Sequence, residues 1–175
     1  RSPSRGLGDV YKRQLLRHVP PTLVNLTTLQ CNDCPLLKDL PDTLVNLITL
    51  QCNDCPLLED LPDTLVNLEC VCLIKCPLIT RIPTTFINLE MIWCRGTRNF
   101  VEIPSTLVNL NHMWCSRCPL LTVTPPELNK LEQLKCFECP RLTIIPPNVT
   151  QFFADSKSTW LDHPSNKDFK SNLGK

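Results

Sequence analysis

Residues 26–46 read LTTLQCNDCPLLKDLPDTLVN, and residues 47–67 repeat this stretch as LITLQCNDCPLLEDLPDTLVN. More divergent copies follow, each beginning with leucine, at Leu68, Leu89, Leu110 and Leu131. The repeat length therefore stays at 21 residues. A fixed period of this length predicts a solenoid, in which each repeat buries its apolar face only by stacking on its neighbours. Such a chain presents a continuous surface, and we do not expect it to enclose an active site.

Two apolar positions in each repeat predict a short β-strand. Counted from the first leucine of each block, positions 4 and 6 are apolar, and polar residues flank them in the first repeats. This alternation with a period of two is typical of a strand with one buried face. The predicted strands are parallel and lie near residues 28–32, 49–53, 70–74, 91–95, 112–116 and 133–137.

Prolines determine the other side of each turn. Position 16 is proline in all six repeats, at Pro41, Pro62, Pro83, Pro104, Pro125 and Pro146. Proline lacks a backbone N–H and blocks the interior of a helix. We therefore expect the back of the solenoid to consist of extended or 3-10 segments.

The pattern L-x-x-L-x-C-x-x-C-x-x-L-x-x-L-P-x-x-L resembles the leucine-rich repeat, whose general form is L-x-x-L-x-L-x-x-N/C-x-L. Its second half is similar to repeats of plant disease-resistance proteins, and the near-identical, cysteine-rich copies resemble those of large DNA viruses and protists. The resemblance extends from Leu16 to about Phe153. It implies an α/β solenoid, a right-handed horseshoe of six full turns. Its parallel β-sheet would line the concave side, and the convex side would be mostly extended or 3-10.

The ends of the chain depart from the repeat. Residues 1–14 share no position with it, and we expect a non-native or disordered leader. The solenoid is expected over 15–151, beginning in mid-repeat with an upstream part missing, and a cap and tail over 152–175. In a strict 21-residue register Phe152 falls at position 1 and Asp155 at position 4, where an apolar residue is needed. The pattern therefore predicts that the sheet ends before this point, with Trp160 and Leu161 covering the last layer.

Charge and motif content exclude several functions. The chain carries 18 basic and 17 acidic residues, a formal net charge of +1. This balance argues against nucleic acid as the partner, since phosphate binding requires a basic stripe. No apolar run is long enough to span a membrane, and neither G-x-x-x-x-G-K nor G-x-G-x-x-G occurs. His112 has no serine or cysteine at a spacing typical of a base and its nucleophile, so we expect no enzyme and no cofactor.

Eight of the twelve cysteines form four C-x-x-C pairs, Cys31/Cys34, Cys52/Cys55, Cys115/Cys118 and Cys136/Cys139. Two such pairs alone are typical of a zinc site. The periodicity favours buried, reduced and metal-free core thiols, because it spreads them one pair per turn at about 4.8 Å. Zinc binding and disulfide bonds stay open as alternatives, although disulfides need Cβ atoms about 3.5–4.5 Å apart. Unpaired thiols in this number favour a reducing, intracellular compartment.

Positions 3, 5 and 7 are predicted to face outward on the concave side. In repeats one and two they hold polar groups such as Gln30 and Gln51, whereas repeats four to six hold aromatic, aliphatic and basic groups. Trp93 and Trp114 share position 5 of neighbouring strands, so we expect their rings about 4.8 Å apart. Tryptophan, methionine and arginine are enriched at protein interfaces. The predicted partner-binding residues are Met91, Trp93, Arg95, His112, Trp114, Arg117, Lys135 and Phe137.

These features predict a non-enzymatic, monomeric scaffold that recognises a protein partner on its concave face. The aromatic residues have two other interpretations, a surface ladder without a ligand and a site that stacks nucleobases. Two other functions stay open for the chain. It could be a metal-binding or redox protein that uses the C-x-x-C pairs, or the recognition module of a larger ligase or receptor-type protein.

Overall fold

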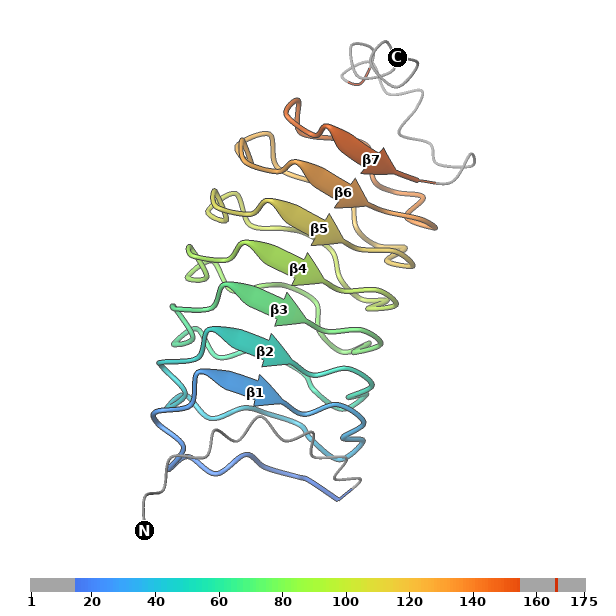
Figure 1. The fold of residues 1–175 in the computed structure, drawn as a ribbon. Coiled ribbons are helices and arrows are strands. Elements are labelled where there is room, and N and C mark those ends of the chain that lie inside the picture. Colours follow the sequence, from blue (N-terminus) through green and yellow to red (C-terminus); the bar gives the residue numbers. More distant parts are fainter. Residues whose placement is uncertain (1–14, 155–165, 167–175) are drawn as a thin grey trace.

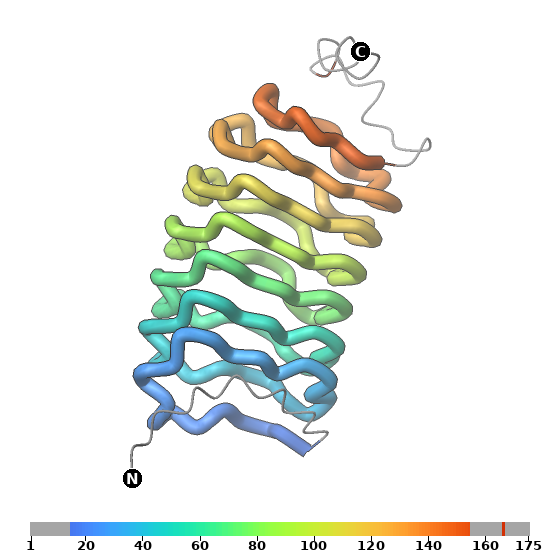
Figure 2. The backbone as a smooth tube through the Cα atoms, in the orientation of Figure 1, coloured from blue at the N-terminus to red at the C-terminus, as the bar shows by residue number. Residues whose placement is uncertain are grey.

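One three-residue β-strand forms in each turn of the solenoid. The computed structural model describes residues 15–154 and Asn166. Its strands are β1 (Thr28–Gln30), β2 (Thr49–Gln51), β3 (Cys70–Cys72), β4 (Met91–Trp93), β5 (His112–Trp114), β6 (Gln133–Lys135) and β7 (Gln151–Phe153). They pair in chain order into one parallel sheet (Figure 1), and the turns stack one above another along it (Figure 2). The predicted parallel-strand solenoid is confirmed.

The middle residue of each strand from β2 to β6 points into the core. These residues have no exposed surface and are Leu50, Val71, Ile92, Met113 and Leu134. The leucine, isoleucine and phenylalanine side chains of the other apolar positions form one continuous cluster with them. Because each turn has an apolar side chain above and below every core position, burial is complete only when several turns are stacked.

The strands are two residues shorter than the predicted segments because the chain bends soon after each one. Position 8 has a positive φ in every repeat, with values between 55° and 76°, at Asp33, Asp54, Lys75, Gly96, Arg117 and Glu138. This left-handed conformation costs about 1–2 kcal/mol in a residue other than glycine. Five of the six residues are not glycine, so the contacts around the bend must impose it.

Side chains at position 9 supply such a contact by linking adjacent turns. The thiol of Cys55 donates to the carbonyl oxygen of Cys31 across a distance of 2.9 Å. The same bond recurs at 2.7–3.0 Å from Cys76, Thr97, Cys118 and Cys139 to the carbonyls of Cys52, Leu73, Cys94 and Cys115. Because these groups are buried, the bond satisfies carbonyls that would otherwise destabilise the folded state.

None of the twelve cysteines forms a disulfide bond in the structure, and eleven are buried while Cys70 is partly exposed. The predicted burial of the eight C-x-x-C cysteines is therefore confirmed. Over the described residues, no three His, Cys, Asp or Glu side chains converge as a metal site requires. Absence of metal from the protein in solution stays a prediction.

A seventh strand corrects the expected register at the C-terminal end. In β7, Phe152 pairs with Leu134 and so occupies position 4, whereas a strict 21-residue spacing placed it at position 1. The last repeat is three residues shorter because Val149 ends the proline turn and leads directly into the strand. Phe152 and Phe153, assigned above to the cap, are thus paired in the sheet. Residues 1–14 and the predicted cap residues Trp160 and Leu161 lie outside the described residues.

The back of each turn is extended, as the prolines predict. The N–H of Leu44 donates to the Pro41 carbonyl, and equivalent turns follow the other position-16 prolines. On the edge between back and sheet, Asn46 Nδ2 donates to the Val24 carbonyl at 2.9 Å, and the bond recurs in the next three turns. No α-helix occurs over 15–154. The described part of the chain has no helix long and apolar enough to cross a membrane.

Replacing Cys76 by valine should lower the free energy of unfolding by about 1–3 kcal/mol, because the buried Cys52 carbonyl loses its donor. Cys76→Thr should cost less, because Thr97 makes the same bond one turn later at 2.8 Å. Urea denaturation followed by circular dichroism measures both variants. Equal losses in the two would contradict a stabilising role for the bond.

Thiol titration of the native protein with a disulfide reagent at pH 7 should detect one accessible thiol, that of Cys70. Burial raises the pKa of Cys70, so less thiolate is present at pH 7 and the reaction should speed up as pH rises. Cys70→Ser should remove this phase, and all twelve thiols should react in urea. Rapid reaction of several thiols in the folded protein would contradict the burial of the other eleven cysteines.

Candidate functional site

The outward side of the strands, called the sheet face below, carries a row of stacked side chains at position 5. The strand register places Trp93 beside Trp114, Trp114 beside Lys135, and Lys135 beside Phe153. The two indole rings lie 4.8 Å apart between centroids and 7° from parallel, as the sequence predicted. Stacked aromatic pairs are worth about 0.5–1.5 kcal/mol beyond the area that they bury.

The ammonium group of Lys135 continues this row, because it lies over the rings of Trp114 and Phe153. Its Nζ lies 3.9 Å from the centroid of the Trp114 ring and 5.0 Å from that of Phe153. An ammonium group over an aromatic ring gains about 0.5–1 kcal/mol at an exposed site. The Trp114 indole N–H also donates to Gln133 Oε1 at 2.9 Å. These contacts hold one edge of the aromatic row in a single arrangement.

An open depression of about 600 Å³ lies beside this row, between the strands and the bend that follows them. Six of the eight predicted partner-binding residues line it, namely Trp93, Arg95, Trp114, Arg117, Lys135 and Phe137. Met91 and His112 lie on the same face at position 3 but do not line it, and the His112 ring contacts the Asn111 side chain. Ile74, Ser116 and Glu138 line the depression and were absent from the predicted set.

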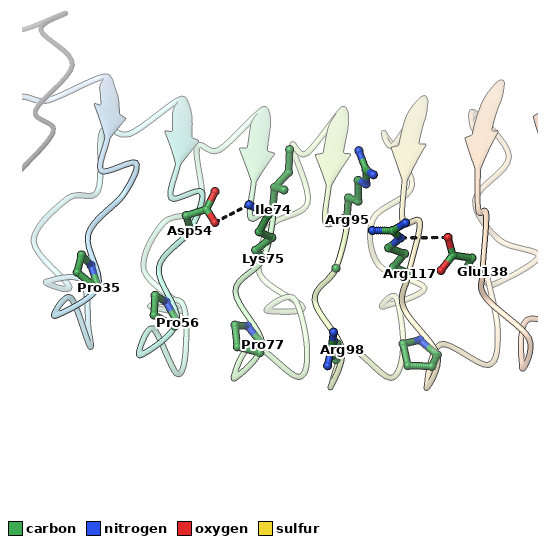
Figure 3. Close-up of a pocket in the computed structure, with 12 residues that line it drawn as sticks. Pro35, Asp54, Pro56, Ile74, Lys75, Pro77, Arg95, Arg98, Arg117 and Glu138 are labelled. Atoms are coloured by element: carbon green, nitrogen blue, oxygen red, sulfur yellow. Dashed lines mark hydrogen bonds and ion pairs between the residues drawn. The ribbon is translucent and has the colours of Figure 1, made fainter. Parts of the chain in front are cut away.

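A second, larger depression of about 910 Å³ follows the bend and shares Ile74, Arg95, Arg117 and Glu138 with the first (Figure 3). Two ion pairs cross it, from Lys75 Nζ to Asp54 at 2.8 Å and from Arg117 Nε to Glu138 at 3.0 Å. Arg95 lies between these pairs. Among the described residues, neither Arg95 nor Arg98, which lines the same depression, makes an ion pair, so their positive charges are not compensated there.

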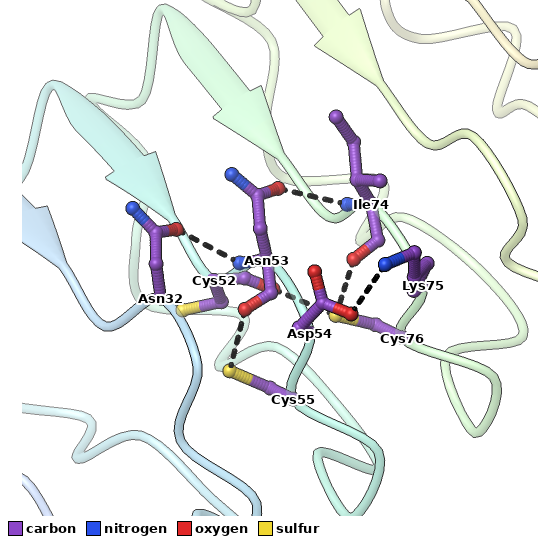
Figure 4. Close-up of polar contacts among 8 residues, drawn as sticks. All are labelled: Asn32, Cys52, Asn53, Asp54, Cys55, Ile74, Lys75 and Cys76. Carbon is purple, nitrogen blue, oxygen red and sulfur yellow. Dashed lines mark hydrogen bonds and ion pairs between the residues drawn. The ribbon is translucent and has the colours of Figure 1, made fainter. Parts of the chain in front are cut away.

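Asparagines at position 7 have a structural role in the first repeats (Figure 4). Asn32 Oδ1 accepts from the backbone N–H of Asn53 at 3.0 Å, and Asn53 Oδ1 accepts from that of Ile74 at 3.0 Å. Asn53 Oδ1 also accepts from the Cys72 thiol at 3.1 Å. From the sequence alone these asparagines were expected only to be polar surface residues. The sequence signal for this role is the Asn-Asp pair that recurs at 32–33 and 53–54, in which the aspartate adopts the positive φ.

The thiols on the sheet face are poorly suited to act as nucleophiles. Burial raises the pKa of Cys70 and that of Cys72, which keeps both thiols protonated at neutral pH. No basic side chain contacts either thiol among the contacts described. The sheet face therefore offers apolar, aromatic and cationic surface.

No protein-family model matches the sequence, and no curated protein matches it. Among solved structures, the chain is similar to the leucine-rich repeat domain of the type III effector XCV3220 (XopL), with a TM-score of 0.60 and 23% identity. The similarity covers 76% of this chain and 52% of that one, so this chain spans about half its length. The plant peptide hormone receptor RGFR1 in complex with RGF2 matches more distantly, with a TM-score of 0.31 and 14% identity over 78% of this chain and 38% of that one.

The fold follows from two independent findings. The parallel strands recur in register from β1 to β6 at the 21-residue period of the sequence. The leucine-rich repeat domain of XopL has a similar fold, with a TM-score of 0.60. The position-9 donors also occupy the N/C position of the repeat pattern. The chain is a cysteine-rich protein with the leucine-rich repeat fold.

Proposed function

We propose that this protein is a non-enzymatic scaffold that recognises a protein partner. The partner docks on the sheet face of repeats three to six, centred on Trp93 and Trp114. One observation carries the proposal: the position-5 row changes from Gln30 and Gln51 at one end to stacked indoles at the other. The scaffold that supports both ends is the same, so packing of the solenoid does not require this change.

The chemistry of the patch supports a protein partner. Phe137 and Phe153 are 40% and 42% exposed beside the indole stack, and clustered aromatic groups on a surface are typical of interaction sites. Trp and Arg side chains contribute most of the binding energy in many interfaces. Arg95, Arg117 and Lys135 would form a charged rim around the aromatic centre.

The indole stack is held in place by its own contacts, and this order favours binding. A partner that packs on Trp114 would lose little side-chain entropy, because the ring is already fixed between Trp93 and Lys135. A ladder without a ligand would show the same stack. Binding measurements separate the two interpretations.

The other candidate functions have less support. A metal-binding or redox role would need thiols that are free to ligate or react, and the position-9 thiols instead donate to backbone carbonyls. A role as the recognition module of a larger ligase or receptor-type protein is compatible with the proposal. We also propose that the protein acts as a monomer inside the cell, where a reducing environment keeps its twelve cysteines in the thiol form.

Substituting both indoles should abolish partner recovery. Protein pulled down from a lysate by the wild type should be lost with Trp93→Ala/Trp114→Ala, and each single change should weaken affinity for the purified partner at least about tenfold. Gln30→Ala/Gln51→Ala is the matched control, because it truncates the same position of β1 and β2. It should leave the affinity unchanged.

Circular dichroism and thermal melting must first show that both double variants are folded. Loss of the stack removes about 0.5–1.5 kcal/mol, which a solenoid of this length should tolerate. If the folded indole variant recovers the same proteins in the same amounts as the wild type, the docking site lies elsewhere.

A further inference from the structure

Three backbone N–H groups beside the aromatic patch make no hydrogen bond within the described part of the chain, and they are called open N–H groups below. In repeats two and three the N–H at position 7 donates to an asparagine of the preceding turn, as in the bond from Ile74 N to Asn53 Oδ1. The next three residues at this position are Arg95, Ser116 and Phe137. Over the described part of the chain, their N–H groups have no hydrogen-bond acceptor.

The backbone does not supply acceptors to these groups. A parallel ladder would offer the carbonyl at position 6 of the preceding turn, but in the structure this carbonyl accepts from the position-9 side chain instead. The side chains that precede the three open N–H groups are Ile74, Arg95 and Ser116, and none accepts from them. The groups therefore form a row of three donors, one per turn, spaced by about 4.8 Å.

Positive charge surrounds this row. Arg95 is exposed and lies in both depressions, whereas Lys75 and Arg117 are neutralised by Asp54 and Glu138 (Figure 3). Gly96, at a φ of 76°, leaves position 8 of repeat four without a side chain. The Gly96 backbone therefore lines the depression beside Arg95, next to the Lys75 side chain.

We propose that this row binds carboxylates of an acidic, extended segment of the partner protein, an inference that rests on the proposed function. Oxygen atoms of Asp or Glu side chains accept from the open N–H groups while the Arg95 guanidinium balances their charge. Hydrogen bonds to an ionised acceptor are about twice as strong as neutral ones. Successive backbone N–H groups that point to one side form anion-binding sites in other folds. The acidic segment would lie beside the aromatic patch and orient the partner on it.

The direct test measures binding of fluorescein-labelled, C-terminally amidated hexaglutamate by fluorescence anisotropy at low ionic strength. Hexaglutamine with the same label is the control peptide. Hexaglutamate should bind at least about tenfold more tightly, and its affinity should fall as salt is added. Equal binding of the two peptides would overturn the proposal. Tighter binding of a labelled twelve-residue oligothymidylate would assign the site to nucleic acid and would overturn it too.

Arg95→Gln should weaken hexaglutamate binding about tenfold, since it removes the uncompensated charge that lies next to the N–H row. Lys75→Gln is the matched control, because Asp54 already neutralises Lys75, and it should change binding much less. Gly96→Asp should weaken binding and Gly96→Lys should not. Both should fold, because Asp54 and Lys75 occupy the same position with φ values of 55° and 58°. Equal effects of the Arg95 and Lys75 variants would contradict the site.

Ile74→Asn tests the open donors without changing any charge. Its amide oxygen should accept from the Arg95 N–H as Asn53 accepts from the Ile74 N–H, which closes one donor. Binding of hexaglutamate should weaken at least about threefold while the melting temperature is kept or raised. Ile74→Leu, which has no acceptor, should have no effect. Unchanged binding in the folded asparagine variant would rule out the donor row.

Partner recovery separates failure of this inference from failure of the proposed function. If Trp93→Ala/Trp114→Ala loses the partner and Arg95→Gln keeps full affinity for it, the docking face stands and the acidic contact is wrong. If both variants recover the same proteins as the wild type, both proposals fail.

Discussion

The bond from the position-9 side chain of repeats two to six to the carbonyl of the preceding turn is the interaction on which the rest of the solenoid depends. The position-6 carbonyl accepts from this side chain where a longer parallel ladder would use it to accept from the backbone N–H at position 7 of the next turn. The strand ends there after three residues and the chain bends. Cysteine suits this position because its thiol packs like a small apolar group and still donates weakly. Thr97 shows that the position requires a donor and does not require sulfur.

The parts of the fold that could be predicted are those that repetition enforces. Once the strand at position 4 is identified in one block, the 21-residue spacing transfers it to every other block, and with it the separation of Trp93 and Trp114. The register of Phe152 could not be predicted in this way. Three residues are missing before it, and Val149 serves both as the end of one turn and as the lead into the next strand.

The candidate site likewise has features that could be predicted from the sequence and features that could not. Outward positions follow from the period of two, so Trp93, Arg95 and Trp114 could be placed on one face from sequence. The depression and its open N–H groups could not, because they depend on which hydrogen bonds the neighbouring turns leave unmade. Asn53 and Ile74 occupy the same position in successive turns, yet only the asparagine satisfies the next backbone donor.

The near-identity of the first two turns has a consequence for how this protein can vary in length. Each face of a turn such as 47–67 carries the hydrogen-bonding groups that its neighbour requires, so a duplicated or deleted copy leaves no donor or acceptor unmatched. Unequal crossing-over within this stretch of the gene would therefore change the number of turns in whole steps. The aromatic end would keep its internal geometry while its distance from the opposite end grew or shrank by one strand spacing, about 4.8 Å. The polar turns therefore act as a spacer of adjustable length. Evolution can change the length of the solenoid without changing the residues of the aromatic patch.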